Sequence, residues 1–510
     1  MNSKETPRVT YCLDCYASDK WDPISHGKDY DFSKPFFVQL DELLRKVPQR
    51  NLFQDFISNS EFSNYAVHVK NSYLCSGGHH YEDSAHCAQN FNLKSCLDVD
   101  FSSNSEECFD SAHLRKCSKI RYGYYSEDCF DSWLIYGCRN CSNCFGCTNL
   151  RNKSYCIWNV QYTKSEYEEK LKEMNLSDVP KLKELKKKFF KDTLSYPRKF
   201  ASIRNAVDST GDDLERVKNC HYCFSLTEDE NIKYSFFVPT GGKDCYDIEH
   251  VGLGTSESYE LHSAFGSSKV FFSNRVYYSL NVQYSDDCYN SGDLFGCVSL
   301  RKKNYCILNK QYTKEEYEVL LPKIIKHMDE MPYTDSHARV WKYGEFLPID
   351  IMPFGYNETL AQEYYPLSKK EILEKGYLYK EEEVKNHKPT ILPSQLPSIE
   401  NVDEKILTEI IQCEHMGNCN DKCTTAFRLI SMELTILKSL GAPLPHMCPN
   451  CRHMDRLSRI TPLKLWHRSC MCDLGNHDHA GKCSNEFETP YAPEKPEKVY
   501  CEGCYQKEVL

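Results

Sequence analysis

Short apolar runs recur at a fixed spacing through the first third of the chain, with Ser, Asn, Asp and Gly between them. Leu93, Leu114 and Ile135 stand 21 residues apart, and the segment Ser-Glu-Glu-Cys-Phe-Asp-Ser at 105–111 returns at 126–132 with one Glu replaced by Asp. Brief β-prone runs that alternate with turn residues at such a period are typical of a parallel β-helix. The pattern therefore predicts a solenoid with about 21 residues per coil.

Cysteines follow the same spacing. One register holds Cys75, Cys96, Cys117 and Cys138, and a second holds Cys87, Cys108 and Cys129. Coils stack about 4.8 Å apart, so residues one period apart would form ladders along the solenoid. Since cysteine is small and often buried, we interpret these as inward-facing packed thiols. Cross-coil disulfides, which need Cα atoms about 5 Å apart, and a metal–thiolate ladder are the alternatives.

The solenoid pattern returns after an interruption. The segment at 145–157 is matched 150 residues later at 295–307, and each copy leads into Gln-Tyr-Thr-Lys-x-Glu-Tyr-Glu. The Thr and the first Glu of this motif have capping-box spacing, so each copy should be followed by a helix. Pro180 is expected to end the first of these helices and begin another, whose Lys-rich run at 181–191 we interpret as a solvated face.

Four cysteines at three-residue steps, Cys138, Cys141, Cys144 and Cys147, superficially resemble an iron–sulfur run. The ferredoxin pattern needs a longer last step followed by proline, which is absent here. We favour packed thiols, with a local zinc as the alternative. The lone pair Cys220 and Cys223 is either half of a site or another coil corner.

Two CxxC knuckles near the C-terminus indicate zinc. Two thiolates on one tight turn occupy two corners of a tetrahedron, and a second pair completes it. For the first zinc we predict Cys413, Cys423, Cys448 and Cys451, with Cys419 spare. For the second we predict Cys472, Cys483, Cys501 and Cys504, with Cys470, His477 and His479 as substitutes. About two zinc ions are expected, in closed structural sites because four thiolates leave no position for water.

A third knuckle, Cys12 and Cys15, repeats the local text of Cys501 and Cys504 but has no further cysteine within the first 70 residues. Its partners would come from far along the chain, from His26 or from another subunit. The alternative is a relic knuckle with free thiols.

The segment between the solenoid and the zinc region is rich in proline, with a linker at 388–398. Asp403 should open a helical stretch to Ile411, and a helix is expected over 427–440, ending at Gly441. The predicted divisions are an N-terminal knuckle and helix (1–65), a first β-helix half (66–163), a helical insertion (164–200), a second β-helix half (201–313), a helix and Pro-rich region (314–400) and a zinc-binding domain (401–510). The fold class predicted is mainly β: a two-part parallel β-helix interrupted by helices, with a C-terminal α+β zinc-binding domain.

Basic residues gather directly after the Cys451 knuckle, at Arg452, Arg456, Arg459, Lys464 and Arg468. Such a cluster could contact phosphates, which makes nucleic acid a candidate partner through 452–468. A solvated face, or pairing with local carboxylates, is the reading we favour.

Composition narrows the possibilities. The 510 residues hold 29 cysteines, 35 tyrosines and a formal net charge of −10, with no apolar run long enough to cross a membrane. No secretory signal is visible, and an odd number of cysteines cannot pair completely, so a disulfide framework is not expected. We expect a reducing intracellular location, no membrane partner, and a charge that argues against a general nucleic-acid coat.

Several longer motifs resemble a known family. They are Ser-Asp-Lys-Trp-Asp-Pro at 18–23, the aromatic segment at 29–37, both Gln-Tyr-Thr-Lys copies, and the segments at 353–366 and 491–501. Together they resemble uncharacterised cysteine-rich zinc-ribbon repeat proteins of candidate-phyla bacteria and of phage and environmental sequences. The resemblance implies a complete zinc ribbon around the position of Cys12, of which this chain lacks the opening half. This chain also departs from the family in its C-terminal ribbon, which is stretched between Cys472 and Cys483.

Three functions are compatible with these patterns. A zinc-binding scaffold that binds a protein partner or another copy of itself, for instance in a virion or other assembly, explains the repeats and the absence of a nucleophile motif. A nucleic-acid-associated zinc-ribbon protein is the second, and a carbohydrate-active β-helix enzyme is the third. The enzyme would need paired carboxylates, for which a ladder of Asp110 and Asp131 is the candidate. We favour the scaffold and predict no catalytic residue.

Overall fold

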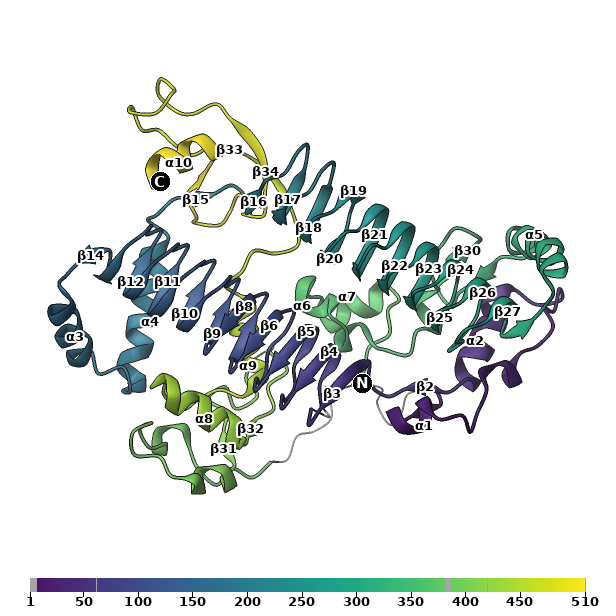
Figure 1. Ribbon diagram of the computed structural model, residues 1–510, viewed down its shortest axis with the longest axis horizontal. Coiled ribbons are helices and arrows are strands. Elements are labelled where there is room, and N and C mark those ends of the chain that lie inside the picture. The colour runs from purple at the N-terminus through teal and green to yellow at the C-terminus, as the bar shows by residue number, and fades with distance from the viewer. Residues whose placement is uncertain (1–6, 61, 382–386, 420, 510) are drawn as a thin grey trace.

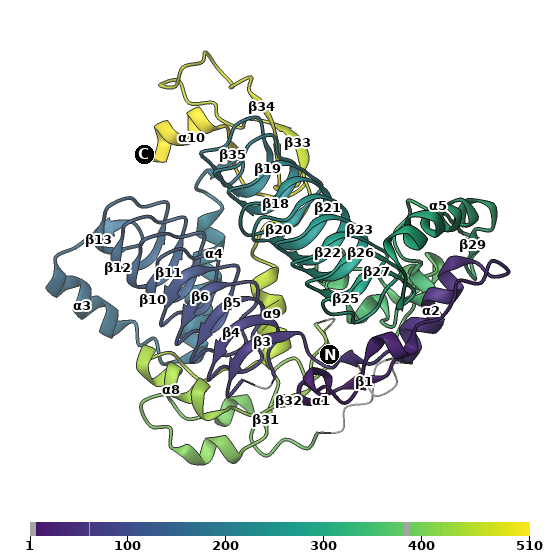
Figure 2. The ribbon, with the colours of Figure 1, turned by 45° about the vertical axis from the view of Figure 1, so that its right-hand side comes forward.

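Two parallel β-helices, here called the first and second solenoids, lie side by side in the computed structural model, which describes residues 7–60, 62–381, 387–419 and 421–509 (Figure 1). Helices cover the ends of the solenoids, and the C-terminal segment runs along the first solenoid and then reaches the second (Figure 2). The predicted fold class, a mainly β chain with a two-part parallel β-helix and a cysteine-rich C-terminal region, is confirmed.

The first solenoid begins earlier than the predicted residue 66. Its parallel strands are β3 (Gln54–Ser58), β4 (Asn64–Lys70), β5 (Ser76–Glu82), β6 (Phe91–Lys94), β7 (Leu97–Asp100), β8 (Ser103–Glu106), β9 (Phe109–Ala112), β10 (Ser118–Tyr124), β11 (Phe130–Tyr136), β12 (Ser142–Thr148) and β13 (Ser154–Ile157), and the antiparallel β14 (Val160–Gln161) closes it.

One coil contains 12 residues, not 21. Asn64 pairs with Ser76, Ser118 with Phe130 and Ser142 with Ser154, always 12 residues apart. Every third residue points inward, so two residues separated by any multiple of three can both face the interior. A separation of 21 is one coil of 12 plus three triplets, which is why it resembled a coil length. Cysteines 21 residues apart therefore share the interior but stand on different sides of it.

The three-residue rhythm comes from the backbone. Left-handed conformations recur at every third position, as at Lys116, Lys119, Tyr122 and Tyr125, with φ between 50° and 60°. Asn and Asp adopt this conformation more readily than most residues, which explains the Asn- and Asp-rich text of the repeats. Stacked Asn side chains add to it, since the Asn59 amide donates to Asn71 and the Asn71 amide to Asp83.

The coil changes direction at these left-handed residues, its corners, and inward serines and cysteines form hydrogen bonds with the backbone there. The Ser60, Ser72 and Ser84 hydroxyls each accept a backbone N–H from 12 residues later, at 2.9 to 3.2 Å. The Cys87 thiol donates to the Ala85 carbonyl at 3.2 Å, and other inward thiols do the same. A narrow coil needs small side chains that can hydrogen-bond, because buried backbone groups must be paired. All 17 solenoid cysteines, Cys75 through Cys306, are buried and free of disulfides, which confirms the packed-thiol prediction.

The second solenoid has the same construction. Its strands are β16 (Ile203–Arg204), β17 (Thr210–Glu215), β18 (His221–Thr227), β19 (Glu230–Lys233), β20 (Phe236–Val238), β21 (Lys243–Gly252), β22 (Ser256–Phe265), β23 (Ser268–Tyr277), β24 (Leu280–Gln283), β25 (Asp286–Tyr289), β26 (Gly292–Phe295) and β27 (Asn304–Ile307), closed by β28 (Lys310–Gln311). Early coils differ by a residue, as where Lys243 pairs with Ser256, and later ones keep 12.

Helices close the solenoid ends and also join the two halves. The predicted capping boxes begin α3 (Lys164–Glu173) and α5 (Lys314–Glu330), and α4 (Val179–Thr193) follows α3. Helices α3 and α5 lie over the last strands of their own solenoids, β13 and β27. Helix α4 precedes the second solenoid in the chain but packs against the later coils of the first, whereas α2 (Phe36–Lys46) precedes the first and packs against the later coils of the second. Each solenoid is thus covered by the helix that leads into the other.

The remaining elements are short and lead to the cysteine-rich region. They are η1 (Pro23–His26), β29 (Tyr333–Thr334), β30 (Val340–Trp341), η2 (Ile349–Ile351), η3 (Tyr356–Glu358), α6 (Ala361–Tyr364), α7 (Lys369–Glu374), η4 (Pro393–Gln395) and η5 (Glu404–Thr408). The stretch expected to begin at Asp403 is the 3-10 helix η5, and the helix expected over 427–440 is α8 (Ser431–Leu440), which ends at Gly441 with φ 60°. Part of the predicted helix and Pro-rich region, residues 382–386, lies outside the described residues. No helix in the described ranges has the length and apolar character needed to span a membrane.

Candidate metal centres

Four cysteines come together in the first metal module, residues 411–457. The sulfur atoms of Cys413, Cys423, Cys448 and Cys451 lie within 4.8 Å of one another, and all four residues are buried. Cys413 and Cys423 flank the hairpin of β31 (Ile411–Gln412) and β32 (Ala426–Phe427), while Cys448 and Cys451 lie at the start of α9 (Pro449–Leu457). This is the set predicted for the first zinc.

Backbone amides point at these sulfur atoms. The Cys448 N–H donates to Cys413 Sγ at 3.3 Å and the Thr424 N–H to Cys448 Sγ at 3.5 Å. The contact between Cys413 and Cys448 lowers the pKa of Cys448 and raises that of Cys413, so the pair shares its first proton. Donors aimed at sulfur favour the thiolate, the form that binds metal.

The second metal module, residues 466–509, contains Cys470, Cys483, Cys501 and Cys504, also buried and with sulfur atoms within 4.8 Å of one another. The predicted set had Cys472 where the structure groups Cys470 with the other three cysteines. Cys470 directly follows β33 (Trp466–Ser469), which pairs with β34 (Glu486–Thr489), so the hairpin places it beside the CxxC knuckle. Cys472 lies two residues further and meets His477 instead, with Sγ and Nδ1 3.0 Å apart.

The two modules are copies of one another. In each, the N–H of the first cysteine donates across the hairpin at 2.8 Å, from Cys413 to Thr425 O and from Cys470 to Asn485 O. In each, the first knuckle cysteine donates its N–H to that same first cysteine, Cys501 to Cys470 Sγ at 3.2 Å. Aligning Cys413-x-His415 with Cys470-x-Cys472 would have identified Cys470 from the sequence.

The N-terminal knuckle has the same local geometry as the last one. Tyr16 N–H donates to Cys12 O at 2.8 Å, and Tyr505 N–H to Cys501 O at 2.9 Å, each at the start of a helix: α1 (Leu13–Ala17) and α10 (Glu502–Val509). Cys12 and Cys15 are exposed, and no ligand cluster found among the described residues includes them or His26. Their role as ligands stays a prediction.

Both knuckles sit at equivalent places on the solenoids. The Arg301 guanidinium lies 4.5 Å from the Tyr16 ring centre, and Arg151 donates to the Tyr505 hydroxyl at 3.1 Å. The preceding strands also match, because β1 (Thr10–Tyr11) pairs in parallel with β2 (Gln49–Arg50) and β35 (Val499–Tyr500) with β15 (Arg198–Lys199). Arg151 and Arg301 belong to the 150-residue repeat seen in the sequence.

The four cysteines at 138–147 occupy successive inward positions of one coil. Their sulfur atoms are not part of any cluster within 4.8 Å in the part of the chain that the structure describes. Cys220 and Cys223 also face a solenoid interior, so they are coil corners.

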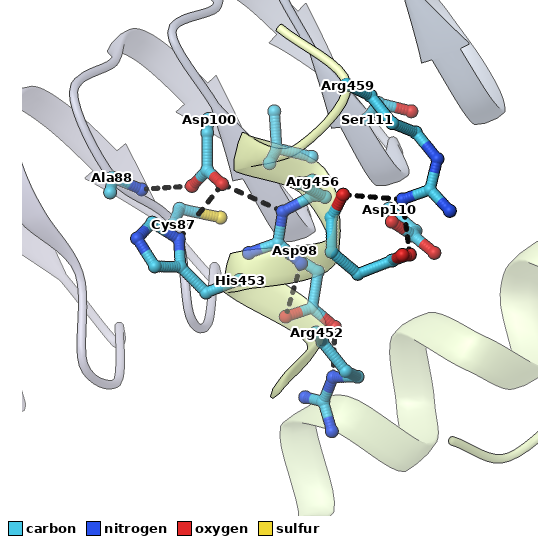
Figure 3. Close-up of polar contacts among 12 residues, drawn as sticks. Cys87, Ala88, Asp98, Asp100, Asp110, Ser111, Arg452, His453, Arg456 and Arg459 are labelled. Atoms are coloured by element: carbon cyan, nitrogen blue, oxygen red, sulfur yellow. Dashed lines mark hydrogen bonds and ion pairs between the residues drawn. The ribbon is translucent and has the colours of Figure 1, made fainter. Parts of the chain in front are cut away.

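The basic segment after Cys451 forms buried ion pairs with the first solenoid, a contact here called the α9 joint. Arg452 donates to Asp98 at 2.7 Å, and Arg456 donates to Asp100 at 2.8 Å and lies 3.1 Å from the other Asp98 oxygen (Figure 3). Both arginines are buried, at 5% and 1% exposure, and the two aspartates lie on β7 of the first solenoid. In this arrangement neither guanidinium is open to a phosphate.

The charges at this joint stabilise one another. His453 lies 3.1 Å from Asp100 and 3.2 Å from Glu363. Although burial opposes it, pairing with Asp100 raises the pKa of His453 to about 9. Burial also opposes ionisation of Asp100, but Arg456 and His453 outweigh it and lower the pKa of Asp100 to about 2.

The other three basic candidates are also engaged within the chain. Arg459 pairs with Asp455, Lys464 lies over the Trp466 ring, and Arg468 donates to the Tyr491 and Ala492 carbonyls. The favoured interpretation of the basic cluster, pairing with local carboxylates, describes Arg452, Arg456 and Arg459.

The proposed carboxylate ladder does not form. Asp110 and Asp131 are 21 residues apart, and with a 12-residue coil they stand in different columns. Asp110 is paired with Lys186 at 3.0 Å and Asp131 with Arg121 at 2.6 Å. The arrangement does not provide the two facing carboxylates that glycoside hydrolysis needs.

A recess of about 840 Å³ lies between the solenoids, lined by Tyr65, Phe236, His250, His262 and Tyr364 among others. Glu249, His250 and His262 form another close cluster there. Its histidines are held by amides, since His250 Nε2 lies 2.9 Å from Gln89 Oε1 and His262 Nδ1 lies 2.7 Å from Asn274 Oδ1.

Comparison with known proteins adds little to this description. The chain matches no protein-family model, and no curated protein matches it. Among solved structures, a presumed acetyltransferase from Desulfovibrio desulfuricans G20 aligns at 10% identity over 56% of this chain and 84% of its own, with a TM-score of 0.12. The class defined by the fold and the site is a double parallel β-helix with two cysteine-rich modules suited to metal. The resemblance to the zinc-ribbon repeat family stays a prediction.

Proposed function

We propose that this protein is a zinc-stabilised interaction scaffold in which the metal holds the C-terminal segment against both solenoids. The observation that carries the proposal is the pair of buried tetracysteine groups. Four thiolates at tetrahedral distances suit zinc and leave no open position for a substrate or a catalytic water. A structural role therefore fits these groups better than a catalytic one.

The chain around each module supports this role. In the first module the cysteines fix the start of α9. Arg452 and Arg456 of this helix form ion pairs with aspartates on β7 of the first solenoid. In the second module β35 pairs with β15, at the entrance to the second solenoid.

Between the modules, the chain touches both solenoids at one residue. The Thr461 N–H donates to the Tyr125 hydroxyl of the first solenoid at 2.7 Å, and the Thr461 hydroxyl donates to Asp212 of the second at 2.7 Å. The C-terminal segment thus bridges the two solenoids, and metal at its two modules would hold that bridge in place.

A protein partner or a second copy of the chain is the occupant we propose for such a scaffold. A rigid double solenoid offers a long surface, and 35 tyrosines suit protein recognition. The nucleic-acid alternative is not favoured, because Arg452 and Arg456 are buried in ion pairs.

The test is metal content followed by metal removal. Full-length protein purified under reducing conditions should contain zinc, and a chelator should make the segment from 401 onward sensitive to protease while the solenoids stay resistant. A Cys108→Ser variant, altered only inside a solenoid, is the control and should keep its zinc. Protein without bound metal, or unchanged protease sensitivity after zinc removal, would refute the proposal.

A further inference from the structure

We infer that each metal module holds two metal ions, joined by the thiolate of its last cysteine: Cys451 in the first module and Cys504 in the second. This inference deepens the proposed function and rests on metal binding at the tetracysteine groups. In both modules a second cluster of ligands shares that last cysteine with the tetracysteine group.

In the second module the additional ligands are Cys472, His477 and His479. Their ligand atoms and the Cys504 sulfur all lie within 4.8 Å of one another. His479 Nε2 lies 3.4 Å from Cys504 Sγ, and His477 Nδ1 lies 3.0 Å from Cys472 Sγ. Around a tetrahedral zinc, with bonds of about 2.3 Å to sulfur and 2.0 Å to nitrogen, neighbouring ligand atoms are about 3.5 Å apart.

The histidines are oriented as ligands. His479 Nδ1 is 2.8 Å from the Gly481 carbonyl, so it carries the proton and leaves Nε2 free to bind metal beside Cys504. His477 is 7% exposed, and its Nε2 has no hydrogen-bond partner but lies 3.8 Å from Glu508. Metal-binding histidines commonly direct their second nitrogen at a carbonyl or carboxylate in this way.

The first module has the same arrangement with different ligand types. His415, Cys419 and Asp421 cluster with Cys451, whose sulfur is 3.7 Å from that of Cys419. The buried Nδ1 of His415 has no hydrogen-bond partner and lies 3.5 Å from Asp421 Oδ2. Cysteine, imidazole and carboxylate are all zinc ligands, so the exchange of types between the modules preserves the chemistry.

The order of the ligands along the chain is shared as well, although the intervals between them differ. Counting from the first cysteine, the ligands fall at Cys413, His415, Cys419, Asp421 and Cys423, and at Cys470, Cys472, His477, His479 and Cys483, each series followed by a CxxC knuckle. With one metal ion per module, Cys419 and Cys472 would not be ligands. With two, each of them belongs to the second cluster. Shared order in two copies of different sequence indicates a common seven-ligand site.

Charge favours the second ion. The second module brings five cysteine sulfurs together, four of them in the tetracysteine group and one at Cys472. With every sulfur ionised, one zinc would leave three negative charges uncompensated, whereas two would leave one. Uncompensated charge is costly in a buried site, and a bridging thiolate lets two ions share a ligand.

The experiment is zinc stoichiometry on the full chain, measured by elemental analysis after loading with zinc and gel filtration. We expect about four zinc ions per chain. The double variant His477→Ala/His479→Ala leaves the second tetracysteine group intact and should lose one zinc, as should His415→Ala/Asp421→Ala. His467→Ala, an exposed histidine in the same module, is the matched control and should lose none.

Cadmium-113 NMR of cadmium-loaded protein separates the sites by ligand type. The wild type should show all-sulfur signals and two mixed signals, one from each module, and His477→Ala/His479→Ala should remove only the mixed signal of the second module. Two zinc ions per chain with both double variants unchanged would overturn this inference and leave the scaffold proposal standing. No bound zinc would overturn both.

Discussion

The character of single residues in the solenoids follows from the 12-residue coil. Besides apolar inward residues such as Leu93 and Leu114, many inward positions hold Ser or Cys, which are small and donate to a backbone carbonyl at the corner of the coil. Ser105 Oγ donates to Ser103 O at 3.0 Å, and the Cys108 thiol of the next triplet donates to Glu106 O at 3.2 Å. These cysteines are therefore structural substitutes for serine with more apolar surface, and no metal is needed to explain them.

Substitution at Cys108 tests this reading. Cys108→Ser keeps the donor and the volume, so we expect the free energy of unfolding to fall by less than about 1 kcal/mol. Cys108→Phe overfills a fully buried position and should cost about 1–3 kcal/mol or more. Urea denaturation followed by circular dichroism measures both variants. Equal stabilities for the Ser and Phe variants would contradict the narrow-interior account.

At the scale of elements, α9 is held by charge as much as by packing, and its docking should depend on pH. The folded pKa of His453 is about 9, above its ordinary 6.5, so its contribution is complete below pH 6.5 and is lost as the pH rises through 9. The folded pKa of Asp100 is about 2, below its ordinary 3.8, so its contribution is complete above pH 3.8 and is lost as the pH falls through 2.

A comparison of the wild type with His453→Gln isolates the loss of stability expected at alkaline pH. Between pH 6.5 and 9.5 the urea midpoint of the wild type should fall toward that of the variant, and the difference between them should shrink. His467→Gln is the control, because this histidine is exposed and lies outside the joint. A difference that stayed constant over this range would show that His453 is not charged in the folded protein.

Prediction from sequence succeeded where the signal is local. The capping boxes at Thr163 and Thr313 and the stop at Gly441 each depend on a few neighbouring residues, and the helices begin and end as they specify. The coil length was misjudged because inward positions recur every three residues, so several multiples of three give plausible periods. Cys470 was ranked below Cys472 because the choice between two neighbouring cysteines depends on the register of the hairpin, which spacing alone does not define.

At the scale of the whole molecule, the chain is a duplication whose halves cover each other. A helix, a short strand and a solenoid occur twice, as α2, β2 and the first solenoid and as α4, β15 and the second. Pro48 O accepts from Ser299, and Pro197 O accepts from Asn149, which are equivalent positions of the two repeats. Since α2 and α4 each pack against the later coils of the other solenoid, while α3 and α5 lie over the last strands of their own, the exchanged helices hold the two halves together.

The packing of α2 and α4 against the other solenoid makes a prediction that a simple tandem arrangement would not. Phe36 of α2 packs against Phe295 with ring centres 5.0 Å apart, and Phe189 of α4 lies 6.4 Å from Trp158; both phenylalanines are fully buried. Phe36→Ala should cost about 3–5 kcal/mol locally and raise amide hydrogen exchange near 292–311, the end of the second solenoid, although Phe36 precedes the first in the chain. Phe189→Ala should instead raise exchange near 142–161. Each variant is the control for the other in one mass-spectrometric experiment. If Phe36→Ala loosened only 142–161, the packing of α2 against the second solenoid would be wrong. If both variants loosened both segments equally, the solenoids would be stabilised as a single unit.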